Sequence, residues 1–483
     1  MWPFTSDLVN ENYIRAASPN ERRCIVREYL GFYRALIVGG IFEFAESVDT
    51  KSVFTYIHAV RHCIDRHPQL SVTISEAKSE SPYYVFCPHL DLGQHIEILD
   101  YNDQSGERET RAIQRVLPSI LDTKWPATVP AWKLVVLPFS DRRCFVGFSF
   151  SHTIADGVSG LAFNRTFLDA LQMRHVMTDL TYTSTRKPFN QPFDTAKNLT
   201  ISWSFLLRPL LGAYLPKWIA TLCGGVHSLS PGTWTGVPNF YDPETYQTGV
   251  EILTIDANVV EDALKLCRMH GAKLTGLLHQ MIVSALSDCL PEPHMIDSFS
   301  SATPINMRRQ VNASNDDMGL FVSVDYQTFS LQKTSSNQTS KKFSWDLAKS
   351  VTERLAVKSQ QLHDQPIGLL RYLTSVHSWT LSKLGARREG SYAVSNLAGF
   401  RPLGSVDRCS VAVMFFCQPA DVTGGPPLTF NVVSVMGGAL SIAVSWQVGA
   451  LGFGLEREEV EFVKHICDHI RSGLALLSNN SDV

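Results

Sequence analysis

The order of apolar and polar positions predicts a chain of mixed helices and strands. Apolar residues recur at helical spacing over 18–30, 53–64, 108–121, 257–270, 275–290, 343–363 and 456–477. Runs rich in β-branched and aromatic residues predict strands at 33–44, 70–74, 83–86, 132–137, 144–150, 250–255, 298–305, 319–329, 392–397, 409–417, 428–436 and 439–448. Both halves of the chain run through helices, strands and a polar stretch at the end of a strand. We therefore predict an α+β fold of two related lobes.

Two helix starts can be predicted from their capping residues. Ser18 precedes Pro19 and stands three residues before Glu21, which predicts a capping box. Asp49 precedes the second apolar-periodic segment and is expected to cap its helix. We also expect a bulge or a close backbone contact at Gly39–Gly40, within the strand predicted over 33–44.

The stretch from Phe145 to Gly160 reads FVGFSFSHTIADGVSG and joins a strand to a helix. Its first part is a nearly continuous apolar run, which is typical of a strand buried on both faces. The run ends at His152, and an apolar helical pattern resumes at Val158. A titratable imidazole therefore stands where a buried strand ends, a common place for reactive groups.

Composition divides the chain into three parts. Residues 1–185 and 248–483 carry the periodic segments, whereas Pro, Gly, Asn, Thr and Trp accumulate in between, so we interpret 186–247 as a crossover between the two lobes. Within it, Phe205 to Val226 is apolar but is interrupted by two prolines and two charges. We prefer a packed, kinked amphipathic segment here, with peripheral membrane attachment as the alternative.

Overall composition narrows the functional class. The chain has 483 residues, 44% hydrophobic and 18% charged, with a formal net charge of -3, which describes an ordinary globular protein with a large core. No basic block is present, so we do not expect nucleic acid as a partner. The ten cysteines form no C-x-x-C pair, and we find no signal peptide and no membrane span. These features favour the cytoplasm. We expect a monomer, but the sequence does not determine the oligomeric state.

The spacing His152-x-x-x-Asp156 is weak evidence by itself, because chance predicts about one such pair in this chain. Its context makes it informative, since it ends an apolar strand, Gly157 follows the aspartate, and an Asn-x-Arg sequence follows a strand in the second half. Rival catalytic patterns are missing from the sequence: G-x-S-x-G, a Walker loop, G-x-G-x-x-G after a strand, and H-E-x-x-H or another metal-ligand cluster.

The stretch SHTIADG resembles the HxxxDG motif of the acyltransferase superfamily of chloramphenicol acetyltransferase, plant BAHD enzymes, condensation domains and fungal alcohol O-acetyltransferases. Further segments resemble the fungal alcohol acetyltransferases in the same order along the chain: 20–22, 30–34, 67–70, 303–309 and 395–400. Two departures narrow the match. The DFGWG motif of BAHD enzymes is absent around Trp446, and Ser151 replaces the first of the two histidines typical of condensation domains.

This resemblance implies two chloramphenicol-acetyltransferase-like lobes with an active-site channel between them. It implies that His152 is the general base for acyl transfer, since an imidazole titrates near working pH. Asp156 either orients His152 or, as in the family, pairs with an arginine. Arg308 is our preferred partner, and Arg309 and Arg34 are the rivals.

Three further residues complete the candidate site. Gly157 would allow close backbone passage, and a nearby main-chain N–H would bind the oxyanion. Ser395 and Asn396 fall where the family places polar groups near the thioester, although an ordinary strand-end turn explains them equally well. Arg387, Arg388 and Arg401 are weaker candidates for CoA phosphates, because a solvated basic surface is the simpler explanation.

The predicted function is transfer of an acyl group, acetyl by resemblance, from a CoA thioester to the hydroxyl of a hydrophobic small molecule, within secondary metabolism. No metal and no permanently bound cofactor are expected, because acyl-CoA is a co-substrate. Two alternatives stay open: an acyl donor carried on a carrier protein, and a ligand-binding protein without turnover on the same fold. The acceptor, the acyl chain length, the choice between ester and amide formation, and weak membrane association are not determined by the sequence.

Overall fold

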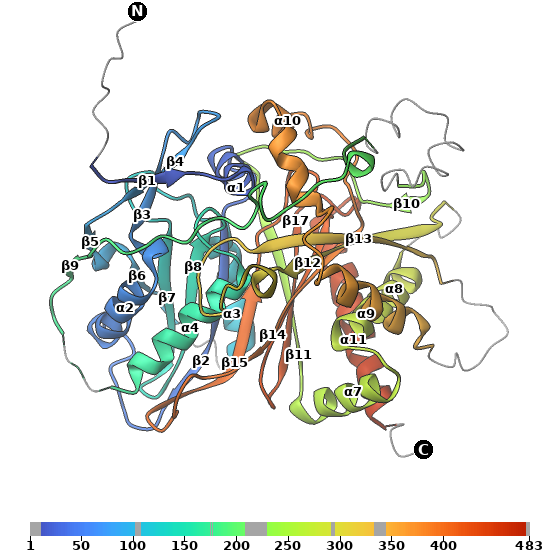
Figure 1. Ribbon diagram of the computed structural model, residues 1–483. Helices are drawn as coiled ribbons and strands as arrows, with labels where there is room; N and C mark the ends of the chain where they lie inside the picture. Colours follow the sequence, from blue (N-terminus) through green and yellow to red (C-terminus); the bar gives the residue numbers. More distant parts are fainter. Residues whose placement is uncertain are drawn as a thin grey trace, which may run out of the picture.

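The computed structural model describes residues 11–101, 108–173, 175, 177–207, 229–290, 295–332 and 344–479. Two lobes lie side by side, each built around a sheet that is covered by helices (Figure 1). The predicted α+β class and two-lobed architecture are confirmed. Most of the apolar segment 205–226 lies outside the described residues. No described helix combines the length and the apolar character that crossing a bilayer requires.

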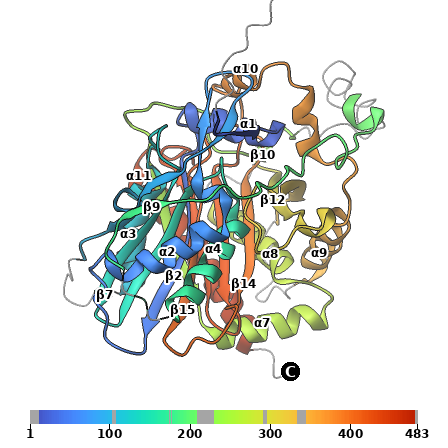
Figure 2. The same cartoon turned by 60° about the vertical axis from the view of Figure 1, so that its left-hand side comes forward.

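The first lobe contains a five-stranded sheet in the order β15-β2-β8-β7-β6. Its strands are β2 (Ala35–Phe44), β6 (Ile96–Ile98), β7 (Trp132–Ser140), β8 (Arg143–Ser151) and β15 (Cys409–Cys417). Helices α2 (Phe54–Arg66) and α4 (Gly157–Leu171) pack on one face, and α3 (Glu109–Leu121) packs on the other (Figure 2). Both faces of β8 are therefore buried, as its apolar run predicted.

The second lobe contains a larger sheet in the order β10-β12-β14-β16-β17-β11, and β13 pairs with β12. The strands are β10 (Thr233–Trp234), β11 (Thr248–Ile255), β12 (Ser298–Asn306), β13 (Val322–Ser330), β14 (Tyr392–Phe400), β16 (Leu428–Val435) and β17 (Leu440–Gln447). The helices that pack against it are α7 (Ala257–Met269), α8 (Leu274–Cys289), α9 (Asp346–Lys358) and α11 (Glu456–Asn479).

The smaller elements sit mainly at the edges of the lobes. They are β1 (Tyr13–Ala16), α1 (Pro19–Tyr29), β3 (Val72–Ser75), β4 (Tyr83–Phe86), β5 (His89–Asp91), β9 (Thr181–Thr183), α10 (Val376–Leu381) and the short helices η1 (Pro68–Ser71), η2 (Leu92–Gln94), η3 (Arg308–Val311) and η4 (Pro366–Tyr372). The predicted capping box of α1 is confirmed, since the Glu21 N–H donates to Ser18 Oγ and the Ser18 N–H donates to Glu21. The predicted cap of α2 is wrong, because Val53 occupies its N-cap and Asp49 lies in the preceding turn.

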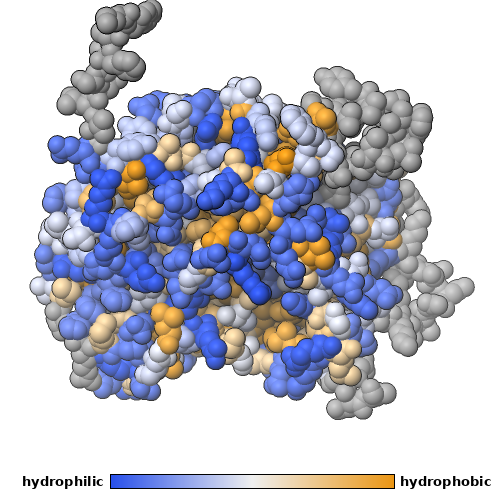
Figure 3. All heavy atoms as spheres, viewed as in Figure 1, coloured by the Kyte–Doolittle hydropathy of each residue, from blue (hydrophilic) through white to orange (hydrophobic). Residues whose placement is uncertain are grey.

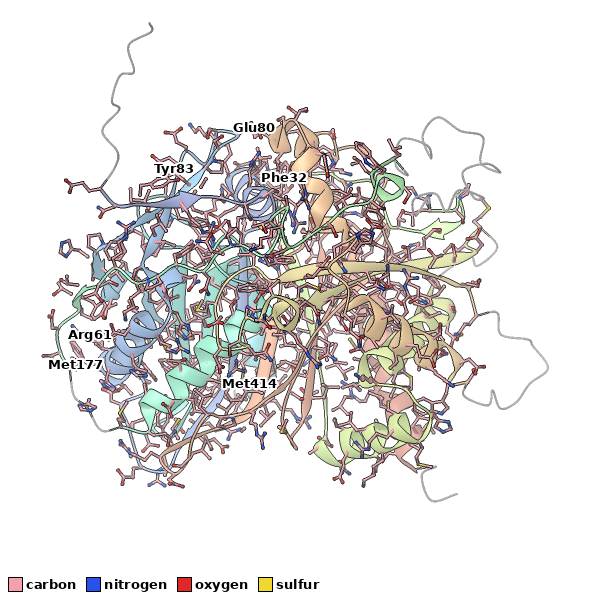
Figure 4. The ribbon with its side chains drawn as sticks, viewed as in Figure 1. Phe32, Arg61, Glu80, Tyr83, Met177 and Met414 are labelled. Atoms are coloured by element: carbon pink, nitrogen blue, oxygen red, sulfur yellow. The ribbon has the colours of Figure 1, made fainter. Side chains whose placement is uncertain are left out.

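The two lobes are joined by more than one connection. Strand β15 comes from the second half of the chain but pairs antiparallel with β2 in the first sheet. At the top of the molecule, the Glu80 carboxylate accepts hydrogen bonds from Ser375 Oγ (2.5 Å) and from the Val376 N–H (3.1 Å) at the start of α10 (Figure 4).

Candidate active site

The turn from β8 into α4 presents the residues of the predicted motif. Strand β8 ends at Ser151, His152 follows at once, and α4 begins at Gly157. Asp156 is the N-cap of α4 and accepts a hydrogen bond from the Ser159 N–H at 2.9 Å. An aspartate at this position satisfies a free N–H of the first helical turn. The connection that carries His152 is therefore held between the end of β8 and the capped start of α4.

Asp156 forms a buried ion pair with Arg308, which follows β12 in the second lobe. Arg308 Nη1 and Nη2 donate to the two carboxylate oxygens at 2.9 and 2.8 Å, and side-chain exposure is 1% for Arg308 and 0% for Asp156. The Phe321 N–H also donates to this carboxylate at 2.9 Å. Burial raises the pKa of Asp156, but the charge and hydrogen bonds of Arg308 outweigh it and hold the pKa below its usual value.

The ion pair keeps Asp156 away from the imidazole. Among the described residues, no hydrogen bond or ion pair links His152 to a carboxylate. Of the two rival arginines, Arg34 donates to the Asp122 carbonyl and to Tyr241, and Arg309 is exposed. The geometry thus gives Asp156 a structural place at the junction of the lobes, next to the candidate base.

Gly157 and Gly160 allow α4 to approach its neighbours closely. A Cβ at Gly157 would lie 2.7 Å from Leu397 Cδ2 of β14, and one at Gly160 would lie 2.4 Å from Val38 Cγ2 of β2. The first glycine therefore lets the turn approach the second lobe, and the second lets α4 rest on the first sheet.

His152 lines a cavity of about 290 Å³ between the lobes. Tyr33 faces it, with ring centroids 5.7 Å apart, and the Arg27 guanidinium lies 4.3 Å from the Tyr33 ring centre. Burial, followed by the positive charges of Arg23 and Arg27, lowers the pKa of His152 to about 4, against the opposing effect of Asp156. The imidazole is therefore neutral at physiological pH, the form that can accept a proton.

The cavity wall is mainly apolar, with charged groups on a few elements. The apolar and proline side chains come largely from β12, β13, η4, α10 and the loop after β15: Pro304, Leu320, Val322, Val324, Ile367, Leu370, Trp379, Pro419 and Pro426. The charged groups are Arg23 and Arg27 of α1, with Glu389 and Asp421 of the second lobe. On the outer surface, apolar side chains gather near the middle of the face seen in Figure 3, among hydrophilic ones. An apolar wall that also carries polar and charged side chains is typical of a small-molecule site.

A second cavity, of about 270 Å³, adjoins the first at Pro304. Strands β12 and β14 are paired only at Ser301–Ala302 with Tyr392–Ala393, and the cavity lies beyond this pairing, between the two strands and helices α8 and α9. Ala302 and Ala393 line the first cavity, and their neighbours Thr303 and Val394 line the second. Because side chains alternate along a strand, the two cavities lie largely on opposite faces of this part of the sheet.

Ser395 and Asn396 lie on opposite faces of β14, because successive side chains alternate along a strand. Asn396 lines the second cavity, donates to Thr275 Oγ1 of α8 at 3.1 Å and accepts from the Ala398 N–H at 2.8 Å. Ser395 is buried and lies on the face of β14 that carries Ala393. The structure therefore places only one of these two residues on the His152 side of the strand.

Two of the three weaker arginine candidates have structural partners, and the third, Arg401, is exposed. Arg388 is 1% exposed and donates to the carbonyls of Val237 and Asp421 and to Gln447. Arg387 donates to the carbonyls of Ser230, Pro231 and Thr233. Among the described residues, no group of three or more His, Cys, Asp or Glu could hold a metal ion.

Several cavity residues were not among the predicted site residues, although Asn20 falls within the segment 20–22 that resembles the family. Asn20, Arg23 and Arg27 share one face of α1, at the i, i+3, i+7 spacing that places residues on one side of a helix. The sequence shows this spacing, but no sequence feature near it indicates that this face of α1 lies close to His152. Glu28, which accepts a hydrogen bond from Ser151 Oγ, lines a third cavity of about 380 Å³ in the first lobe, and burial raises its pKa to about 7.

Comparison with solved structures defines the fold class. The trichothecene 15-O-acetyltransferase TRI3 of Fusarium sporotrichioides superposes with a TM-score of 0.62 at 14% sequence identity, covering 96% of this chain and 98% of that one. The chain therefore has the two-lobed fold of this acetyltransferase and, as predicted, of the wider acyltransferase and condensation-domain superfamily.

Sequence comparison then identifies the family. The model of the alcohol acetyltransferase family matches residues 21–464, so the chain belongs to this family of acyltransferases. The probable alcohol acetyltransferase crmB of Aspergillus fumigatus is 22% identical over 395 residues, covering 77% of this chain and 81% of that protein. The probable alcohol acetyltransferase FCK4 of Fusarium pseudograminearum is 22% identical over 449 residues, covering 88% and 86%.

Proposed function

We propose that this protein transfers an acyl group, acetyl in the simplest case, from a CoA thioester to the hydroxyl of a hydrophobic small molecule. The observation that carries the proposal is the position of His152, whose imidazole lines a largely apolar cavity between the lobes. The lowered pKa of His152 agrees with a neutral imidazole there. Family membership supports acyl transfer to an alcohol. Secondary metabolism, a cytoplasmic location and a monomeric state stay predictions from the sequence.

In the proposed mechanism, His152 accepts the proton of the acceptor hydroxyl as its oxygen attacks the thioester carbonyl. The C–O bond forms, and the carbonyl electron pair moves onto oxygen as an oxyanion. Collapse of this tetrahedral intermediate breaks the C–S bond, and the imidazolium returns the proton to the leaving thiolate. A positioned general base of this kind contributes roughly 10²–10⁴-fold to the rate.

The two adjoining cavities support a ternary complex without an acyl-enzyme. The cavity containing His152 and the cavity containing Asn396 meet at Pro304 from opposite faces of the diverging strands. Two substrates approaching from opposite sides could therefore be bound at once. We assign the acceptor to the His152 cavity and the thioester arm of the donor to the Asn396 cavity, where Lys273 is among the lining residues.

The test is release of free CoA thiol by purified protein given acetyl-CoA and a panel of aliphatic, terpenoid and phenolic alcohols. The ester product is detected by its mass. We expect thiol release that needs an alcohol and that falls roughly 10²–10⁴-fold in His152→Ala. Thiol release that survives His152→Ala would contradict the assigned base, and absence of turnover with every acyl-CoA would contradict the proposed donor.

A further inference from the structure

The charges around the His152 cavity are unevenly paired. Arg27 Nη2 lies 2.7 Å from Asp421, and Glu389 forms an ion pair with Lys383. Arg23, one turn before Arg27 on α1, contacts only a neutral group among the described residues, since its Nη2 donates to Asn20 Oδ1 at 3.2 Å. Its Nε is buried and has no hydrogen-bond partner there. One cation of this cavity is therefore left without an anion.

An unpaired guanidinium is poorly suited to a cavity that takes only neutral, apolar substrates. Its remaining N–H groups would lose water when such a substrate fills the space, and buried polar groups without partners are costly. A carboxylate, in contrast, matches the guanidinium geometry and accepts two parallel hydrogen bonds.

We propose that the substrate bound in the His152 cavity carries a carboxylate in addition to its apolar body, and that Arg23 binds this carboxylate. The inference rests on the proposed acyl transfer and specifies its substrate class. The carboxylate has two chemical sources: a hydroxy acid as acceptor, or a dicarboxylic acyl group that is bound to CoA through one carboxyl and extends from the Asn396 cavity past Pro304 into the His152 cavity. The phosphates of CoA are separated from the thioester by the whole pantetheine arm, so they do not supply it.

Binding at Arg23 would also affect the candidate base. The charged and titratable groups around the ring are Arg23 and Arg27 on α1, Tyr33 after it, Asp156 on the same turn, Tyr326 on β13, and Glu389 and Asp421 in the loops of the second lobe. A carboxylate on Arg23 cancels one positive charge that opposes formation of the imidazolium. The pKa of His152 then rises, which makes the imidazole a better proton acceptor for this class of substrate.

The experiment compares matched substrates on the wild type, Arg23→Gln and Arg22→Gln. Arg22 is the matched control, because it carries the same charge on the same helix but does not line the cavity. One arm uses ω-hydroxy acids of six to ten carbons and their methyl esters with acetyl-CoA. The other arm uses malonyl-CoA against acetyl-CoA with a neutral alcohol.

We expect the wild type to prefer the charged member of one pair by roughly 10–100-fold in kcat/KM, the range expected for a hydrogen bond to a charged group. Arg23→Gln should abolish this preference, mainly through KM, and Arg22→Gln should retain it. The acidic limb of the kcat/KM profile should also move to higher pH in Arg23→Gln, because a positive charge near His152 is removed. This movement tests whether the charge of Arg23 lies close to His152, whereas loss of the preference between matched substrates tests carboxylate binding.

Equal kcat/KM for charged and neutral substrates in both arms would overturn the inference and leave the proposed function intact. A preference that survives Arg23→Gln would overturn it as well. If no substrate turns over, the proposed function fails. Arg23 is then tested by the thermal shifts that the hydroxy acids and their esters produce in the same variants. Equal shifts in wild type and Arg23→Gln would count against the inference.

Discussion

The charges of Asp156 and Arg308 are removed from water almost completely, so each depends on the other and on a few hydrogen bonds. Arg308 also donates to the Asp317 carbonyl and lies 4.7 Å from the Phe321 ring centre. Such a pair holds two lobes in one geometry, but its net stabilisation is limited by the desolvation of both ions. Removing only one partner is strongly destabilising, because the charge of the other partner stays buried without compensation.

Asp156→Asn should therefore lower the free energy of unfolding by about 3–5 kcal/mol. Arg308→Lys should also be destabilising, since an ammonium cannot make the two parallel hydrogen bonds of a guanidinium. Urea unfolding followed by tryptophan fluorescence measures both effects. The exposed Lys349–Glu353 pair provides the control, because Lys349→Gln should change stability by less than about 0.5 kcal/mol. A loss below about 1 kcal/mol in Asp156→Asn would contradict this account of the pair.

Helix α4 is positioned by its contact with β2, and this contact in turn positions the turn that carries His152. A Cβ at Gly160 would lie 2.4 Å from Cγ2 and 2.7 Å from Cβ of Val38, which is branched and lies on a buried strand. The neighbour that must move is therefore close to the backbone, and it has little freedom.

Gly160→Ala should separate α4 from the sheet and cost about 1–2 kcal/mol, since overpacking outweighs the gain of about 1 kcal/mol in helix propensity. Thiol-release activity should fall with it, because Asp156 begins the same helix. Adding Val38→Ala should recover part of both losses. Gly454→Ala is the control, since its Cβ would meet nothing closer than 3.8 Å. A Gly160→Ala protein with the stability and activity of the parent would show that α4 does not pack closely against Val38.

The elements that sequence patterns predict well are those whose signals are local. The helix from Pro19 and the hairpin of β7 and β8 follow from capping and alternation, and the Gly39–Gly40 contact is real, because a Cβ at Gly39 would lie 2.3 Å from the Val146 carbonyl oxygen. The pairing of β15 with β2 joins distant parts of the chain, and the sequence of an apolar strand does not show which strand it pairs with. The place of Arg23 in the His152 cavity could not be predicted for the same reason, because the two residues come together only in the folded chain.

At the scale of the whole molecule, four histidines with lowered pKa values make folding sensitive to acid; His67, His95 and His279 are buried and His152 is half-buried. Burial lowers the pKa of His67 and His279 to about 3 and that of His95 and His152 to about 4. In the unfolded chain each titrates near 6.5. Between these values the unfolded state binds more protons than the folded state, so stability falls as the pH decreases. Glu28 acts in the opposite direction, because its pKa is raised to about 7 and the folded state holds its proton.

Each histidine contributes a slope of up to about 1.4 kcal/mol per pH unit, and Glu28 offsets about one of the four. The free energy of unfolding thus changes by up to about 4 kcal/mol per pH unit below pH 6, which is large compared with the typical free energy of unfolding of about 5–15 kcal/mol. Urea midpoints should therefore fall steeply between pH 6 and pH 5. His67→Gln should reduce the slope, and His465→Gln, at an exposed position, should not. Equal midpoints at pH 7 and pH 5 would mean that these imidazoles are protonated in the folded state. In that case the pKa of His152 would not be lowered either, and burial would not keep its imidazole neutral.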